Sequence, residues 1–131
     1  MKTIVAIFAG AGLLLATTTA SAETRAEKNE ARVARMIEGR TAGEPVNCIS
    51  ALRSNSIEVI DHVGVVYDAG DTVYVARASD PRMLSTFDTL VINRYGSQLC
   101  TNDMMRTVDR YNGYITGVVF LEDFVPYTKR S

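Results

Sequence analysis

The stretch of sequence that decides the fold is Val63-Gly-Val-Val-Tyr-Asp-Ala-Gly-Asp-Thr-Val-Tyr-Val-Ala76. Two runs of β-branched and aromatic residues flank the turn sequence 68–71, and this pattern predicts a β-hairpin. Similar short runs recur on both sides of the hairpin, with turn residues between them. They predict further strands at 46–49, 56–60, 89–95, 114–121 and 124–127.

The segment 104–109 has two interpretations. Asn102 or Asp103 is a suitable N-cap residue, which favours a short helix. We prefer a strand, because Asn112-Gly113 is a hairpin turn sequence and 114–121 supplies the matching strand.

The final run, 124–127, contains Pro126, which lacks the backbone N–H that a central strand uses. We therefore expect a short strand at the edge of a sheet. An exposed edge there could pair with another chain, so we expect either a monomer or a weak dimer.

The segment from Glu23 to about Glu38 has the pattern of an amphipathic helix, with a linker that continues to 42. Thr24 and Glu27 have the spacing of a capping box, and Gly39 suits the end of a helix. We expect this helix to cover an open side of a sheet; the alternative is a helix that binds a partner.

Together these elements predict a mainly β (α+β) protein. An N-terminal helix precedes a small antiparallel sheet or partly open barrel of about 6–7 short strands. The β-rich domain is expected to occupy 43–131 as a single unit.

The first 22 residues have the features of a secretory signal peptide. Lys2 precedes an apolar run at 4–16, and Ala20-Ser21-Ala22 offers small residues for cleavage after Ala22. The run of about 13 residues is shorter than the ~20 needed to cross a bilayer. We expect a periplasmic or secreted chain that begins at Glu23 and has no membrane span; an uncleaved membrane anchor is the alternative.

The composition argues against several classes of function. The chain has 131 residues and a net charge of −1, which gives little attraction to nucleic acid, so we expect no nucleic-acid partner. Two Cys and one His cannot form a four-ligand Cys/His zinc site. Because calcium-loop, P-loop and hydrolase motifs are also missing from the sequence, we expect no metal, no cofactor and no catalytic residue.

Cys48 and Cys100 are the two cysteines of the chain. In an exported protein an even pair is usually a disulfide, so we expect a bridge between them. The alternative is a reactive thiol, but neither cysteine has a basic neighbour or a CxxC partner in the sequence.

His62 follows Asp61, which raises the possibility of a carboxylate that orients a catalytic imidazole. Adjacent residues of a strand point to opposite faces, so the two side chains orient each other only in a turn. We favour a simple turn that joins two strands. The irregular stretch 80–88 has room for one helical turn, and Arg82 and Met83 within it form a possible partner-binding loop.

Three stretches carry a resemblance to a known group of proteins: Gly43-Glu-Pro-Val-Asn-Cys-Ile49, Leu99-Cys100 and Asp123-Phe-Val-Pro-Tyr127. The chain from Arg32 to its C-terminus resembles small exported proteobacterial proteins that contain a domain of unknown function. The resemblance implies export and a single domain, and it implies no activity.

These observations favour an exported, non-enzymatic cell-envelope protein, a small binding or structural domain whose partner is an envelope protein or a small ligand. The first alternative is a periplasmic inhibitor of an enzyme such as a lysozyme or a protease, acting through Arg82 and Met83. A small hydrolase or thiol enzyme that uses His62 or a free cysteine is the second.

Overall fold

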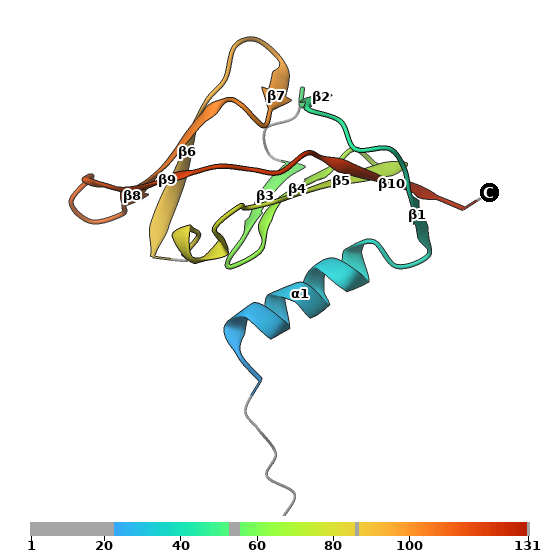
Figure 1. The fold of residues 1–131 in the computed structure, drawn as a ribbon, viewed down its shortest axis with the longest axis horizontal. Helices are drawn as coiled ribbons and strands as arrows, with labels where there is room; N and C mark the ends of the chain where they lie inside the picture. The colour runs from blue at the N-terminus through green and yellow to red at the C-terminus, as the bar shows by residue number, and fades with distance from the viewer. Residues whose placement is uncertain (1–22, 53–55, 86, 131) are drawn as a thin grey trace, which may run out of the picture.

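The computed structural model describes residues 23–52, 56–85 and 87–130 (Figure 1). In these residues one helix, α1 (Arg25–Met36), accompanies strands in three antiparallel sheets. The large sheet has the order β1 (Arg40–Ala42), β10 (Val125–Lys129), β5 (Thr72–Arg77), β4 (Gly64–Asp68), β3 (Ile57–Ile60). The three-stranded sheet has the order β6 (Asp88–Asn93), β8 (Met104–Asp109), β9 (Ile115–Val119). The two-stranded sheet pairs β2 (Cys48–Ser50) with β7 (Gln98–Cys100). The mainly β fold class is confirmed.

The predicted hairpin forms the centre of the large sheet. β4 pairs with β5 in a register that places Tyr67 opposite Tyr74. In the turn, Gly70 has φ +93°, a conformation that favours glycine, and its N–H donates to Asp68 Oδ1 at 2.8 Å. The turn residues therefore fix the register that the strands require.

Both faces of the large sheet are covered, which explains why β4 is buried almost throughout. Successive residues of a strand point to opposite faces, so Val65 and Val66 enter different clusters of the core. The cluster beneath α1 consists of Val33, Ile60, Val63, Val66, Val73 and Val75. The cluster on the other face joins all three sheets and includes Ile49, Val65, Tyr67, Ala76, Leu99, Met105, Val119 and Phe124.

The helix begins with the predicted capping box. The Glu27 N–H donates to Thr24 Oγ1 at 3.2 Å, and the Thr24 N–H donates to Glu27 Oε2 at 2.8 Å. Val33 is the fully buried residue of α1 and packs against the large sheet, so the prediction of a helix that covers a sheet is confirmed. The helix ends at Met36, slightly earlier than expected, and Gly39 adopts a φ of +72° in the turn that follows.

The prediction that 124–127 forms an edge strand is wrong. β10 lies between β1 and β5, as the second of the five strands in the large sheet. Pro126 is tolerated there because β1 ends at Ala42, opposite Tyr127. Beyond that point Gly43 donates its N–H to the Pro126 carbonyl at 2.7 Å, and this bond needs no donor from the proline. Both sides of β10 are therefore paired within the chain, and residues 124–127 offer no exposed edge for a dimer.

The structure also settles the secondary structure of two segments, 104–109 and 40–42. Residues 104–109 form β8, which confirms the strand interpretation over the helix. Residues 40–42, expected in a linker, form β1 instead, because β10 offers them a free strand to pair with. The ten strands of the described residues form three sheets and no closed barrel, so the strands are more numerous than the 6–7 expected from the sequence.

Candidate functional site

The three stretches that carry the family resemblance meet in space and form a seam between the sheets. Val46 and Phe124 exchange two backbone hydrogen bonds of 2.8 Å. The Asn47 carbonyl accepts a hydrogen bond from the Thr101 N–H at 2.9 Å. This seam, made by 43–49, 99–101 and 124–126, joins the two-stranded sheet to the large one, so these residues hold the architecture together.

The disulfide lies in the same seam. Cys48 and Cys100 are opposite each other in the β2–β7 pair, with an S–S distance of 2.08 Å and a Cα–Cα distance of 4.0 Å. The predicted bridge is confirmed. The alternative of a free thiol is wrong for this structure, because both cysteines of the chain are in the bridge.

Asp61 and His62 occupy the turn between β3 and β4, as the sequence predicts. His62 has φ +58°, and its N–H donates to the Leu84 carbonyl at 3.3 Å. Asp61 is buried, and in the described residues its Oδ2 has no hydrogen-bond partner. The turn is confirmed, and the described residues show no hydrogen bond between the two side chains.

The predicted partner loop contains one turn of 3-10 helix, η2 (Pro81–Met83), which confirms the expected helical turn. Asp80 caps it and binds the Arg82 side chain through two contacts of 3.0 and 3.1 Å. The hydrogen bond from Arg82 lowers the pKa of Asp80, and the same bond raises the pKa of Arg82. Arg82 and Met83 are exposed, so both are accessible to a partner, and the inhibitor hypothesis stays a prediction.

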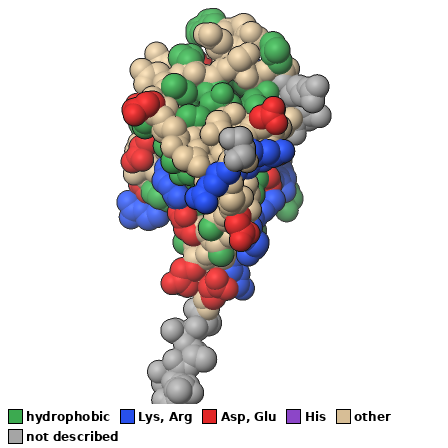
Figure 2. Space-filling view, turned by 90° about the vertical axis from the view of Figure 1, so that its right-hand side faces the viewer, with side chains coloured by type: hydrophobic (Ala, Val, Ile, Leu, Met, Phe, Trp, Pro, Cys, Tyr) green, Lys and Arg blue, Asp and Glu red, His purple; other side chains and the backbone are tan. Residues whose placement is uncertain are grey.

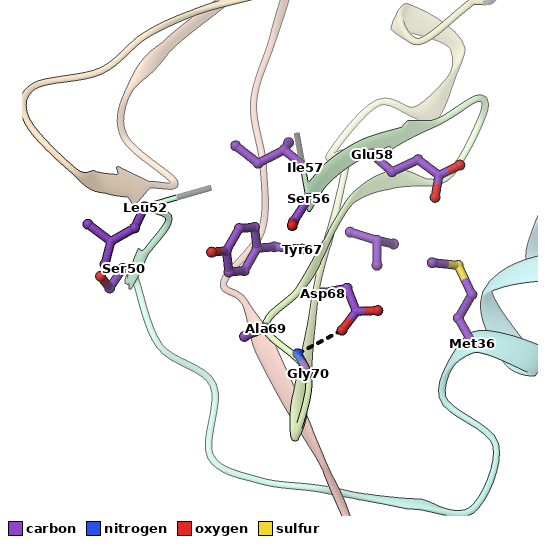
Figure 3. Close-up of a pocket in the computed structure, with 11 residues that line it drawn as sticks. Met36, Ser50, Leu52, Ser56, Ile57, Glu58, Tyr67, Asp68, Ala69 and Gly70 are labelled. Atoms are coloured by element: carbon purple, nitrogen blue, oxygen red, sulfur yellow. Dashed lines mark hydrogen bonds between the residues drawn. The ribbon is translucent and has the colours of Figure 1, made fainter. Parts of the chain in front are cut away.

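The described residues form a cleft of about 730 Å³ at the end of the large sheet (Figure 3). It lies where β4 extends beyond the start of β3. Tyr67 points toward Ser50 and Leu52 on one side of the hairpin, whereas Met36 and Asp68 lie on the other side. The cleft therefore lies at the edge of the large sheet, and its walls come from α1, β2, β3 and the β4–β5 turn.

Both carboxylates of this cleft already make contacts within the protein. Glu58 forms an ion pair with Arg32 of the helix. Asp68 accepts the Gly70 N–H, as the dashed line in Figure 3 shows. A volume of this size is typical of small-molecule sites, but these carboxylates serve the helix contact and the turn.

Charges are mixed on the side of the molecule that lies at the right of Figure 1. Figure 2 shows apolar side chains gathered in the upper half of this side between acidic side chains, with basic side chains below them. A mixed surface of this kind produces no single-sign field that would attract a strongly charged partner to this side.

The three-stranded sheet presents a second candidate surface, at the end of the molecule away from the C-terminus (Figure 1). Met105 and Val119 are paired and buried, so the residues that alternate with them point outward. We call this outward side of β6, β8 and β9 the outer face. Its large apolar residues include Met104, Ile115, Val118 and Phe120, which are 62%, 62%, 48% and 68% exposed.

Arg106 lies in the middle of the outer face. It pairs with Val91 of β6 on one side and with Val118 of β9 on the other. Its side chain makes no hydrogen bond or ion pair with any described residue. The outer face therefore combines exposed apolar side chains with one half-buried cation whose donors are unused.

The outer face is not apparent from the amino-acid sequence. In 104–108 and 115–120 apolar residues occur at both alternating positions, so the pattern does not show which side is buried. The signal that was present is Arg106 itself, a lone charge within the run Met104–Val108.

In the described residues no helix is long and apolar enough to cross a membrane. The described chain also contains no group of three or more His, Cys, Asp or Glu placed to hold a metal ion. No protein-family model matches the sequence, and no curated protein or solved structure is significantly similar to it.

Proposed function

We propose that this protein is an exported, non-enzymatic binding domain of the cell envelope. Its binding surface is the outer face, and its ligand is a protein surface with apolar side chains around one carboxylate. The predicted signal peptide, which lies outside the described residues, and the resemblance to exported proteins support the location. The disulfide agrees with it, because such bridges persist in oxidising compartments.

The observation that carries the proposal is the unpaired Arg106 among exposed apolar residues. Soluble proteins usually avoid contiguous exposed apolar surface unless it binds something. Aromatic residues, Met and Arg are enriched at protein interfaces, and Arg is frequent among the residues that dominate binding energy. A partner carboxylate would use the guanidinium donors of Arg106 and would fix the orientation of the complex.

The binding experiment uses a photo-crosslinking amino acid in place of Met104, with the same amino acid in place of Lys28 on the helix as control. We expect one specific cross-linked protein from the Met104 position in cells. That protein is then purified, and its affinity is measured by calorimetry for the wild type, Arg106→Glu and Arg35→Glu. Arg35 is an exposed helix residue, so its reversal changes the net charge equally without touching the outer face.

We expect Arg106→Glu to weaken binding by about tenfold or more, whereas Arg35→Glu changes it by less than about twofold. Equal effects of the two reversals would refute the outer face as the binding surface. So would a specific product from the Lys28 position alone.

Export is tested separately by intact mass. The mature protein recovered from the periplasm is expected to begin at Glu23. A retained N-terminal segment, or recovery in the cytoplasm only, would contradict the proposed location.

A further inference from the structure

β6 forms an edge of the three-stranded sheet, and in the described residues β8 is its one strand partner. The opposite edge, at β9, is partly covered: the Ser79 N–H donates to the Phe120 carbonyl at 2.8 Å, and Ala78 bridges to Leu121. The edge strands of the large sheet, β1 and β3, are shorter, with three and four residues against six in β6. Among the strands that the structure describes, β6 is therefore the longest one with an unpaired edge.

Natural proteins protect long edge strands with Pro, Lys, bulges or inward-pointing charges. The interior of β6 is Thr89-Leu-Val-Ile92, which has none of these devices and a strong preference for strands. Leu90 and Ile92 point toward the core but remain only half-buried, because the sheet stops beside them. An unprotected edge of this composition is suited to pairing with another strand.

The alternation of backbone groups shows which residues of β6 face the open side. The Asp109 N–H of β8 donates to the Tyr114 carbonyl at 2.8 Å, so Asp109 points its backbone groups toward the β9 side. By alternation Arg106 directs its own groups to β6, where it pairs with Val91. Leu90 and Ile92 therefore direct their N–H and C=O groups to the open side.

We propose that β6 pairs in antiparallel orientation with β6 of a second copy, about a two-fold axis at Val91. In this register Leu90 is opposite Ile92 of the second copy, and Ile92 is opposite Leu90 of the second copy. These residues carry the open backbone groups, so each of the two pairs forms a pair of N–H···O=C bonds. The two three-stranded sheets become one continuous sheet, and the half-buried Leu90 and Ile92 side chains cover each other.

The charges at the ends of β6 favour this register and a second copy as the occupant. With the axis at Val91, Asp88 is opposite Arg94 of the second copy at both ends of the paired segment. Within one copy Asp88 accepts a hydrogen bond from Thr116 Oγ1 at 2.9 Å, and Arg94 donates to the Ala51 carbonyl at 2.8 Å. The second copy would therefore use the other carboxylate oxygen and the remaining guanidinium donors. An axis at Leu90 would place Asp88 opposite Ile92, and an axis at Ile92 would place Leu90 opposite Arg94. Each alternative loses the pairing of opposite charges.

A paired edge of six residues buries less than the ~800 Å² per partner of a standard interface, so the dimer depends on concentration. The purified full chain is studied by analytical ultracentrifugation across a hundredfold range of concentration. We expect the wild type to change from monomer to dimer in this range. We expect Val91→Glu, which places two carboxylates at the axis, to remain monomeric.

Val118→Glu is the matched control. Val118 flanks Arg106 on the other side, so the variant adds the same charge to the same face but away from the β6 edge. We expect it to dimerise like the wild type. Circular dichroism of all three proteins shows whether the variants are folded.

A second measurement tests the register through engineered cysteines. Val91→Cys places two thiols opposite each other at the axis, so we expect a covalent dimer after mild oxidation. Thr89→Cys is the control, because its two copies would be four residues apart along the strands, or ~14 Å, too far for a disulfide.

A wild type that is monomeric at every concentration would refute the dimer. The same holds if the monomer binds extended peptides at β6 but does not bind a second copy. A dimer that persists in Val91→Glu, or equal linking through Thr89→Cys, would refute this interface. The inference goes beyond the proposed function and does not depend on it. Loss of partner binding in Arg106→Glu with dimerisation intact concerns the outer face alone.

Discussion

The disulfide allows a quantitative prediction for the double variant Cys48→Ser/Cys100→Ser. The bridge closes a segment with a sequence separation of 52 residues. In the chain-entropy model a loop of that length stabilises the folded state by about 4 kcal/mol. Without the bridge, β2 and β7 are held by three residue pairs and by the buried side chains of Ile49 and Leu99.

We therefore expect the double variant to fold with a free energy of unfolding that is about 3–4 kcal/mol lower. Typical domains have about 5–15 kcal/mol, so a folded variant with a reduced margin is the expected outcome. Its Tm should fall by roughly 15–25 °C, given about 4–8 °C per kcal/mol for domains of about this size or slightly smaller.

The assay is urea unfolding followed by circular dichroism, with wild type and variant compared under oxidising conditions. Reductant should lower the stability of the wild type to that of the variant, and should leave the variant unchanged. A loss below about 1 kcal/mol would refute the reasoning, because the seam would then hold the two-stranded sheet without the bridge.

Other substitutions test the remaining parts of the fold and the loop. Gly64→Ala should cost more than about 3 kcal/mol by urea unfolding, because its Cβ would lie 2.0 Å from the Ala76 carbonyl oxygen; a cost below 1 kcal/mol would contradict the tight β4–β5 packing. Thr24→Ala removes the cap of α1 and should cost about 1 kcal/mol, measured as a fall in Tm. Val33→Ala should cost about 2–3 kcal/mol, because this side chain is the buried contact of the helix; an unchanged Tm would mean that α1 is not docked. Arg82→Ala should raise the pKa of Asp80 toward its ordinary value in an NMR titration, and an unchanged pKa would show that the pair does not form in solution.

Sequence signals that act over a few residues were sufficient for much of this fold. The hairpin at 63–76 was identifiable because Gly70 and Asp68 form the turn from their own side chain and backbone. The capping box at Thr24 and Glu27 was identifiable for the same reason. The bridge between Cys48 and Cys100 required only the count of cysteines and the expected compartment.

Features that depend on distant parts of the chain were not identifiable. Pro126 suggested an edge strand, but the consequence of its missing N–H depends on where β1 ends, more than 80 residues earlier in the sequence. The outer face required knowledge of which side of β8 is buried, and that is decided by Val119, the partner of Met105. Local patterns define strands well, whereas sheet order and the exposed side of a sheet arise from tertiary packing.

The outer face and the β6 edge belong to the same three-stranded sheet, so a dimer through β6 would bring two outer faces together. Val91 belongs to the β6 edge and also pairs with Arg106, so the second copy would lie beside the outer face without covering its far side at β9. A two-fold axis at Val91 would then place two outer faces side by side on one continuous sheet. A partner with two copies of the recognised segment could bind both outer faces at once. Because the second contact is then intramolecular, the overall avidity can exceed the single-site affinity by about 10²–10⁴-fold. Val91→Glu should abolish this gain because it removes the dimer, and Arg106→Glu should reduce the affinity of each single site.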